Sequence, residues 1–126
     1  MERRFVVIDD DVSTNFYTKL IIKKVFPDAQ VSAFSNPLDA IEYFKNAFSE
    51  AATQTIVLLD INMPELSGWE VLDQIEALNE SKVTFSIFMI SSSINAEDKK
   101  RALGHPLVSG FVEKPINKEK LIKLLA

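Results

Sequence analysis

The most informative stretch of this chain is Thr55-Ile56-Val57-Leu58-Leu59-Asp60-Ile61-Asn62-Met63-Pro64. Its run of β-branched and other apolar residues predicts a buried strand, and an acid, Asp60, stands where the run ends. The turn-forming residues Asn62, Pro64 and Gly68 follow. A carboxylate at the carboxyl end of a central strand lies in the crevice where open α/β sheets bind their ligands. We therefore ask which other residues bring chemistry to Asp60.

Length and composition indicate one globular domain. The chain has 126 residues, and domains usually run to roughly 100–200 residues. Its hydrophobic share of 47% is enough for an ordinary core, and 25% charged residues is usual for a soluble protein. The absence of cysteine excludes a disulfide framework and any thiolate metal site.

Charge and hydropathy argue against a nucleic acid or a membrane as a direct partner. The balance of 14 basic and 18 acidic residues gives a net charge of −4, and there is no basic block. No apolar stretch approaches the ~20 residues of a membrane span. The first apolar run, residues 5–8, is far too short for a signal-peptide core. We expect a cytoplasmic protein.

Strand-like and helix-like segments alternate five times along the chain. The expected strands are residues 4–8, 30–34, 56–59, 85–90 and 108–112. The predicted helix starts are, in order, Ser13 or Thr14 as the first cap, Ser35-Asn36-Pro37, Gly68-Trp69, Ala96 and Asn117 as the fifth cap. Apolar residues of the helices include Phe16, Leu20, Ile21, Val25, Phe26, Leu38, Ile41, Phe44, Phe48, Val71, Leu72, Ile75 and Leu78, followed in the last helix by Leu121, Ile122, Leu124 and Leu125, which are expected on its inner side.

This alternation predicts an α/β fold. Strands separated by helices form a parallel sheet that helices cover on both faces through right-handed crossovers. Runs such as residues 6–8 and 56–59 are apolar throughout, as expected for strands that are buried on both faces. There are no internal repeats and no linker, so we expect a single domain over residues 1–126.

Chemically active residues stand at the end of four of the five expected strands. They are Asp9 and Asp10 after the first strand, Asp60 after the third, Ser91 after the fourth and Lys114 after the fifth. Because the strands are parallel, their carboxyl ends meet at one edge of the sheet. Three carboxylates, a hydroxyl and an ammonium are therefore expected to face one crevice.

A divalent cation would neutralise such a cluster of acids. Neighbouring carboxylates repel one another, and oxygen-only ligands with retained waters suit Mg²⁺ better than zinc or a soft metal. Considered alone, Asp9-Asp10-Asp11 is equally well explained as a solvated loop whose charge is favourable near a helix N-terminus. The additional acid Asp60 at another strand end favours the cation.

Lys114 and Ser91 complete a site suited to phosphoryl transfer. A lone Lys-Pro pair is usually a surface lysine before a turn, but Pro115 keeps Lys114 out of the helical region at a strand end. An ammonium there suits a phosphate oxygen. Ser91 ends an apolar strand and is expected to point inward, whereas Ser92 or Ser93 is expected to cap the next helix. Asp60 is then the nucleophile that attacks phosphorus in line.

These residues resemble the receiver domain of response regulators in two-component signalling, nearly from end to end. The resemblance rests on four motifs, residues 7–11, 59–64 with Gly68, 89–92 and 111–115. Each motif is weak by itself, but all four in this order and spacing are highly specific. The resemblance implies a flavodoxin-like, doubly wound (βα)5 fold with strand order 2-1-3-4-5, as in the chemotaxis receiver.

The resemblance also implies a phosphorelay role for the acids. Asp60 would accept a phosphoryl group from a histidine kinase or a histidine phosphotransfer protein, with Mg²⁺ as the cofactor. Asp10 would ligate Mg²⁺ directly and Asp9 mostly through water. Asp60 and the backbone carbonyl of Asn62 would be the further ligands.

A conformational switch is implied as well. Ser91 would bind one phosphoryl oxygen and Lys114 another, and the movement of the Ser91 hydroxyl would be followed by Phe111. This movement would change the surface formed by the fourth helix, fifth strand and fifth helix. That surface would bind an unknown downstream protein. The chain would be a monomer or a weak dimer through the same face. Ser91 stands where threonine is frequent and keeps the hydroxyl. Phe111 has no hydroxyl to donate, and a plain core phenylalanine is an equal alternative there.

Two other function classes remain as alternatives. A Mg²⁺-dependent aspartyl-phosphate phosphatase or phosphotransferase typically carries a second acid two residues after its nucleophile, where this chain has Asn62. A receiver-like interaction module that is never phosphorylated would not need the complete set of acids, serine and lysine. We therefore expect a signalling phosphoacceptor without an output domain, not an enzyme, with at most weak autodephosphorylation.

Overall fold

Five strands and five helices alternate in the computed structural model of this chain, which describes residues 3–47, 54–78, 85–92 and 95–125. The strands are β1 (Arg3–Ile8), β2 (Gln30–Phe34), β3 (Gln54–Asp60), β4 (Phe85–Ser91) and β5 (Val108–Glu113). The helices are α1 (Val12–Val25), α2 (Pro37–Ala47), α3 (Gly68–Leu78), α4 (Ala96–Gly104) and α5 (Lys118–Leu124). None of the helices in these ranges has the length and hydropathy that a membrane span requires.

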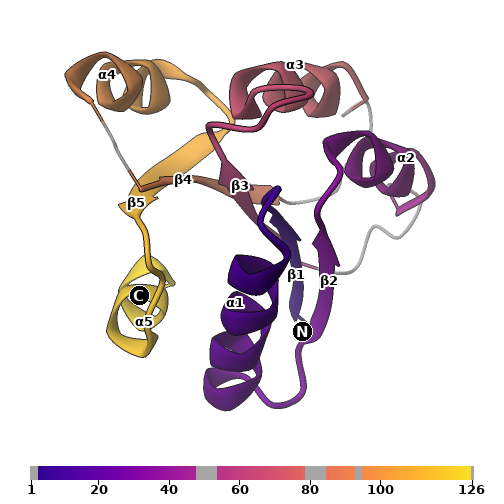
Figure 1. The fold of residues 1–126 in the computed structure, drawn as a ribbon, viewed down its shortest axis with the longest axis vertical. Helices are drawn as coiled ribbons and strands as arrows, with labels where there is room; N and C mark the ends of the chain where they lie inside the picture. Colours follow the sequence, from indigo (N-terminus) through magenta and orange to yellow (C-terminus); the bar gives the residue numbers. More distant parts are fainter. Residues whose placement is uncertain (1–2, 48–53, 79–84, 93–94, 126) are drawn as a thin grey trace.

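The strands form one parallel sheet in the order β2-β1-β3-β4-β5, which confirms the predicted topology (Figure 1). In the centre of the sheet, Ile8 of β1 pairs with Leu59 of β3. The ladder continues to the carboxyl ends of the next strands, where Ser91 of β4 pairs with Glu113 of β5. All five strands therefore end at the same edge.

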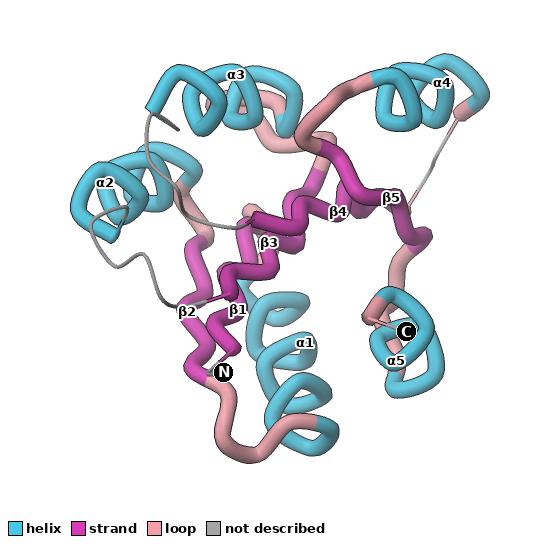
Figure 2. Tube along the Cα trace, turned by 180° about the vertical axis from the view of Figure 1, so that it is seen from behind, coloured by secondary structure: helices cyan, strands magenta, loops and turns pink. Residues whose placement is uncertain are grey.

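Helices cover both faces of the sheet, as predicted. α2, α3 and α4 lie on one face, and α1 and α5 lie on the other (Figures 1 and 2). The side chains of each strand alternate between two apolar cores. One core holds Val6, Ile8, Val57 and Leu59 against helix residues such as Phe44, Leu72 and Ile75. The other holds Phe5, Val7, Ile56 and Leu58 against residues such as Ile22 and Leu121. Each such side chain contributes about 1.5–3 kcal/mol by leaving water.

The N-cap of the first helix lies two or three residues earlier than predicted. Asp11, not Ser13 or Thr14, is its N-cap: the Asp11 carboxylate accepts hydrogen bonds from the backbone N–H groups of Ser13 and Thr14, at 2.9 and 3.1 Å. Aspartate is as good a cap as serine and also carries the charge that favours a helix N-terminus. The third acid of the Asp9-Asp10-Asp11 run therefore starts α1.

The cap of α4 also differs from the prediction. Asn95 caps this helix, since its side-chain oxygen accepts a hydrogen bond from the N–H of Asp98 at 2.8 Å. Ser92 is exposed and precedes the helix, and Ser93 lies outside the described residues. The predicted cap of α5, Asn117, is confirmed.

Several apolar helix positions are exposed. The inner face of α1 is formed by Asn15, Thr18 and Ile22, so Phe16 and Leu20, which are offset from this stripe, point to solvent. Leu38 is likewise exposed. Ile122, expected on the inner side of α5, is also exposed, because one turn of that short helix buries only Leu121. Phe48 lies outside the described residues.

Candidate functional site

The carboxyl edge of the sheet brings together residues from four strands. Asp9 and Asp10 directly follow β1, Asp60 is the last residue of β3, Ser91 is the last residue of β4, and Lys114 directly follows β5. These residues were expected to share one crevice because parallel strands end at the same edge. The contacts described below show that they do lie together.

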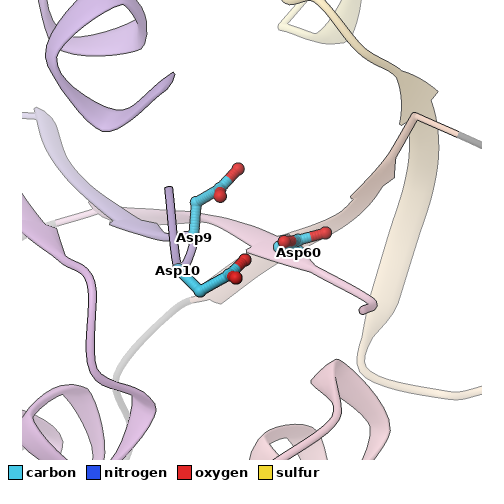
Figure 3. Close-up of side chains that lie close together, drawn as sticks. All are labelled: Asp9, Asp10 and Asp60. Atoms are coloured by element: carbon cyan, nitrogen blue, oxygen red, sulfur yellow. The ribbon is translucent and has the colours of Figure 1, made fainter. Parts of the chain in front are cut away.

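Three carboxylates form the acidic part of the site (Figure 3). Asp9, Asp10 and Asp60 each offer an oxygen, and these oxygens all lie within 4.8 Å of one another. Asp9 is fully buried and Asp60 is 3% exposed, whereas Asp10 is open to solvent. An oxygen-only donor set with access to water suits a hard divalent cation such as Mg²⁺, which keeps several of its waters. The residues therefore fit the predicted metal.

Lys114 lies between the two buried acids. Its ammonium Nζ is 2.6 Å from Oδ2 of Asp9 and 3.3 Å from Oδ2 of Asp60. Burial alone lowers the pKa of Lys114, but its contacts with Asp9 and Asp60 outweigh burial, and the net effect is a raised pKa. Lys114 is therefore a permanent positive charge at neutral pH, and it offsets part of the negative charge of the site.

The Asp60 carboxyl titrates well above its ordinary range. Burial, followed by the negative charge of Asp9, raises the pKa of Asp60 from 3.8 to about 6, against the opposing influence of Lys114 and of the Asn62 N–H. At neutral pH most of the Asp60 side chains are ionised, as a nucleophile must be. A cation held by the same acids would favour the ionised form further.

Asn62 connects Asp60 to Ser91. The backbone N–H of Asn62 donates to Oδ1 of Asp60 at 3.3 Å, and its side-chain Nδ2 donates to Oγ of Ser91 at 3.3 Å. Ser91 is fully buried, and its carbonyl oxygen accepts a hydrogen bond from the N–H of Lys114 at 2.9 Å. The Ser91 hydroxyl thus lies on the same side of the sheet edge as the acids. The role of the Asn62 carbonyl as a metal ligand stays a prediction.

Phe111 of β5 lies between core and surface. Its ring is half-buried against the core under α2, α3 and α4. The ammonium of Lys99 in α4 is 5.2 Å from the ring centroid, within the range of a cation–π contact. The position combines features of both expectations, a core phenylalanine and a switch, and the switch role stays a prediction.

Gly68 has a packing role that its sequence signal, a turn residue, did not reveal. Its N–H donates to the carbonyl of Ile61 at 2.7 Å. A Cβ atom at position 68 would lie 2.4 Å from the carbonyl oxygen of Asp60 and 2.9 Å from Cα of Ile61. Only glycine therefore allows the start of α3 to pack directly on the backbone that presents Asp60.

Sequence reasoning also missed Asn15, whose side chain hydrogen-bonds the carbonyl of Asp9. Its spacing could have identified it. Asn15 lies three residues before Thr18 and seven before Ile22, which is the spacing of one helix face, and these three residues form the buried face of α1.

Known proteins resemble this chain in both sequence and structure. Residues 5–126 match the family model described as the response regulator receiver domain. The response regulator receiver protein from Dyadobacter fermentans DSM 18053 is 26% identical, with a TM-score of 0.85 over 98% of this chain and 94% of that one. A two-component response regulator from Cytophaga hutchinsonii is 25% identical, with a TM-score of 0.87 over the same shares.

A curated relative covers less of the chain. The cell cycle response regulator CtrA of Brucella ovis is 42% identical over 67 residues, which are 53% of this chain and 27% of that protein. The matched stretch is thus about a quarter of the relative's length.

Proposed function

Because this chain belongs to the response-regulator receiver family of two-component signalling, we propose that it accepts a phosphoryl group on Asp60 and transmits the signal through a change of its surface. The observation that carries this proposal is the placement of the Asp60 carboxylate. It is buried at the end of the central strand, 3.3 Å from the Lys114 ammonium and clustered with two further acids. A buried nucleophile that lies beside an ammonium group and beside carboxylates able to bind a divalent cation is suited to phosphoryl transfer.

The proposed reaction transfers phosphorus from nitrogen to oxygen. A carboxylate oxygen of Asp60 forms a bond to phosphorus while the P–N bond of a phosphohistidine breaks, and the imidazole of the donor leaves with the electron pair and takes up a proton. The product is an aspartyl phosphate. The donor is a histidine kinase or a histidine phosphotransfer protein, as expected for a member of this family.

Several groups of the chain would stabilise the charge on the phosphoryl oxygens. Asp9, Asp10 and Asp60 would hold Mg²⁺, which when bound offsets negative charge on the transferring group. Lys114, which follows β5 at the same edge of the sheet, supplies a second positive charge. The Ser91 hydroxyl is a hydrogen-bond donor for a phosphoryl oxygen. The protein's contribution is mainly positioning and electrostatics.

An exposed apolar stripe beside the site supports a protein as the phosphodonor. Val12, Phe16 and Leu20 recur every four residues along α1 and are 68%, 66% and 51% exposed. Val12 directly follows the acidic run Asp9-Asp10-Asp11, so a protein that reaches Asp60 also contacts this stripe. Contiguous exposed apolar side chains are typical of protein–protein contact sites.

The output is proposed to pass through Ser91 and Phe111. A move of the Ser91 hydroxyl toward the phosphoryl group would release its hydrogen bond with Asn62. Phe111 lies in the next strand and contacts Lys99 of α4, so its rearrangement would alter the surface formed by α4, β5 and α5. That surface would bind the unknown downstream protein, with the chain a monomer or a weak dimer through the same face.

We propose a phosphoacceptor and not an enzyme with its own substrate. Position 62, two residues after Asp60, holds an amide that is hydrogen-bonded to Ser91 and therefore cannot act as the second acid of an aspartyl-phosphate phosphatase. Weak autodephosphorylation is the most catalysis we expect. The cytoplasmic location stays a prediction from the sequence.

Intact-mass measurement after incubation with acetyl phosphate tests the proposal. We expect the wild type to gain one phosphoryl group in the presence of Mg²⁺ and none in EDTA. Asp60→Asn should gain none under either condition. The matched control is Asp73→Asn, which removes an exposed carboxylate of α3 and should behave as the wild type.

Two results would contradict the proposal. A phosphoryl gain that persists in Asp60→Asn would place the acceptor elsewhere. No gain from acetyl phosphate, followed by no gain from a panel of phosphorylated histidine kinases, would identify the chain as a receiver-like interaction module that is not phosphorylated.

A further inference from the structure

A buried asparagine of α1 holds the loop that carries the first two acids. Asn15 is 6% exposed. Its side-chain Nδ2 donates to the carbonyl oxygen of Asp9 at 2.8 Å and to that of Phe34 at 3.2 Å. Because both acceptors are carbonyls, both amide hydrogens are used and the orientation of the amide is determined. A buried amide is costly unless it is paired. The two bonds offset the burial of the Asn15 NH₂ group, whereas its oxygen Oδ1 is buried without a hydrogen-bond partner among the described residues.

The peptide between Asp9 and Asp10 depends on this contact. The N–H of Asp9 donates to Phe34 at 3.1 Å, and Oδ1 of Asp9 accepts from the N–H of Asp11 at 2.9 Å. Within the described part of the chain, however, the only hydrogen bond to the peptide that joins Asp9 to Asp10 is the one from Asn15. The orientation of that peptide plane sets the direction in which the Asp10 side chain leaves the backbone.

Asp10 has no other contact that would direct its carboxylate. Its side chain is exposed, and among the described residues it makes no hydrogen bond or ion pair with the protein. It nevertheless places an oxygen within 4.8 Å of oxygens of Asp9 and Asp60. The carboxylates of Asp9 and Asp60, by contrast, are also held by Lys114. Of the three acids, Asp10 is therefore the one whose position rests on the backbone alone.

We propose that Asn15 is a positioning residue for the divalent cation site. By holding the Asp9–Asp10 peptide against α1 and the end of β2, it aims the Asp10 carboxylate toward Asp60. Asn15 acts through Asp10 and contacts neither the cation nor the phosphoryl group. This inference rests on the proposed function, which supplies the cation. Partners that orient ligating groups are typically worth 10–100-fold in metal affinity.

Binding of Mn²⁺ to the full chain tests this role without any phosphorylation. Electron paramagnetic resonance of free Mn²⁺ gives the dissociation constant, and urea unfolding in EDTA gives the stability of each variant. We expect Asn15→Ala to bind Mn²⁺ about tenfold more weakly than the wild type. Asn15→Leu, which fills the same space without donors, should be equally impaired. The matched control is Thr18→Val, a shape-conserving change at another buried polar residue of α1, which should leave the Mn²⁺ affinity unchanged.

The outcomes separate the positioning role from a merely structural one. Wild-type Mn²⁺ affinity in a folded Asn15→Ala or Asn15→Leu protein would overturn the proposal, even if stability were lost. An equal loss of affinity in Thr18→Val would overturn it too, because general loosening of α1 would then be the cause. If the wild type bound no Mn²⁺, the metal site itself would be wrong and the role of Asn15 would be wrong with it.

Discussion

Replacing Asp60 by asparagine is expected to stabilise the metal-free protein at neutral pH, although it removes the proposed phosphoacceptor. The pKa of Asp60 lies at about 6 in the folded protein, against an ordinary value of 3.8, because burial and the charge of Asp9 disfavour the carboxylate. In the unfolded chain the group returns to its ordinary pKa. Between about pH 4 and pH 6 the folded protein therefore binds more protons than the unfolded chain, and its stability falls as the pH rises through this window.

The size of the effect follows from the shift. One pKa unit corresponds to about 1.4 kcal/mol, so the rise from 3.8 to about 6 lowers the unfolding free energy by about 3 kcal/mol above pH 7 and by less than about 1 kcal/mol at pH 4. Asp60→Asn removes this charge and should raise the unfolding free energy by up to about 3 kcal/mol at neutral pH. The net shift already includes the attraction between Lys114 and the carboxylate, so its loss in the carboxamide is not subtracted again.

Urea unfolding in EDTA measures the unfolding free energy of the wild type and of Asp60→Asn at about pH 7.5 and at about pH 4. We expect a large gain for Asp60→Asn at the higher pH and almost none at the lower one, with Asp73→Asn close to the wild type at both. In the wild type, Mg²⁺ at about 100 times its Kd should raise the unfolding free energy by about 2.7 kcal/mol. This would remove most of the difference in stability between the wild type and Asp60→Asn. Unchanged or reduced stability of Asp60→Asn at neutral pH, or a gain that is the same at both pH values, would refute the electrostatic reasoning.

Two further substitutions test other parts of the site. Lys114→Ala should fold and yet slow phosphorylation of Asp60 about 100-fold, as expected when one charge-stabilising group is lost; intact-mass time courses with acetyl phosphate measure the rate, and wild-type kinetics would exclude the role. Gly68→Ala should lower the unfolding free energy by about 1–3 kcal/mol because its Cβ meets the backbone of Asp60 and Ile61. Gly104→Ala is the control, because a Cβ at position 104 meets no atom within 4 Å. Equal urea midpoints for the two variants would show that the backbone of Asp60 and Ile61 moves aside without a cost in stability.

Much of the architecture was predictable because it depends on patterns that neighbouring residues carry. Five apolar runs separated by helical segments predict a parallel sheet, and strands such as β1 and β3 are buried on both faces as their uninterrupted apolar residues indicated. Parallel pairing then places every strand end at one edge. The meeting of Asp9, Asp10, Asp60, Ser91 and Lys114 thus follows from topology, without knowledge of any distance.

Helix ends and helix faces were less predictable. Asp11 and Asn95 cap α1 and α4 where serine or threonine was expected, because several adjacent polar residues could each serve as a cap and only the backbone path selects one. Phe16, Leu20 and Ile122 are exposed. Successive helix positions point about 100° apart, and only the packing of the helix on the sheet decides which of them are buried.

The fold class, the strand order through family resemblance, and the set of side chains that share the site could thus be predicted from the sequence. The pairing of those side chains could be seen only in three dimensions: Lys114 lies closer to Asp9 than to Asp60, the pKa of Asp60 rises to about 6, and Asn15 holds the Asp9–Asp10 peptide. The difference lies in the range of the interactions. Hydrophobic patterning acts through whole faces of strands and helices, whereas ion pairing, desolvation and hydrogen bonding depend on separations of a few ångströms between segments that are distant in the chain.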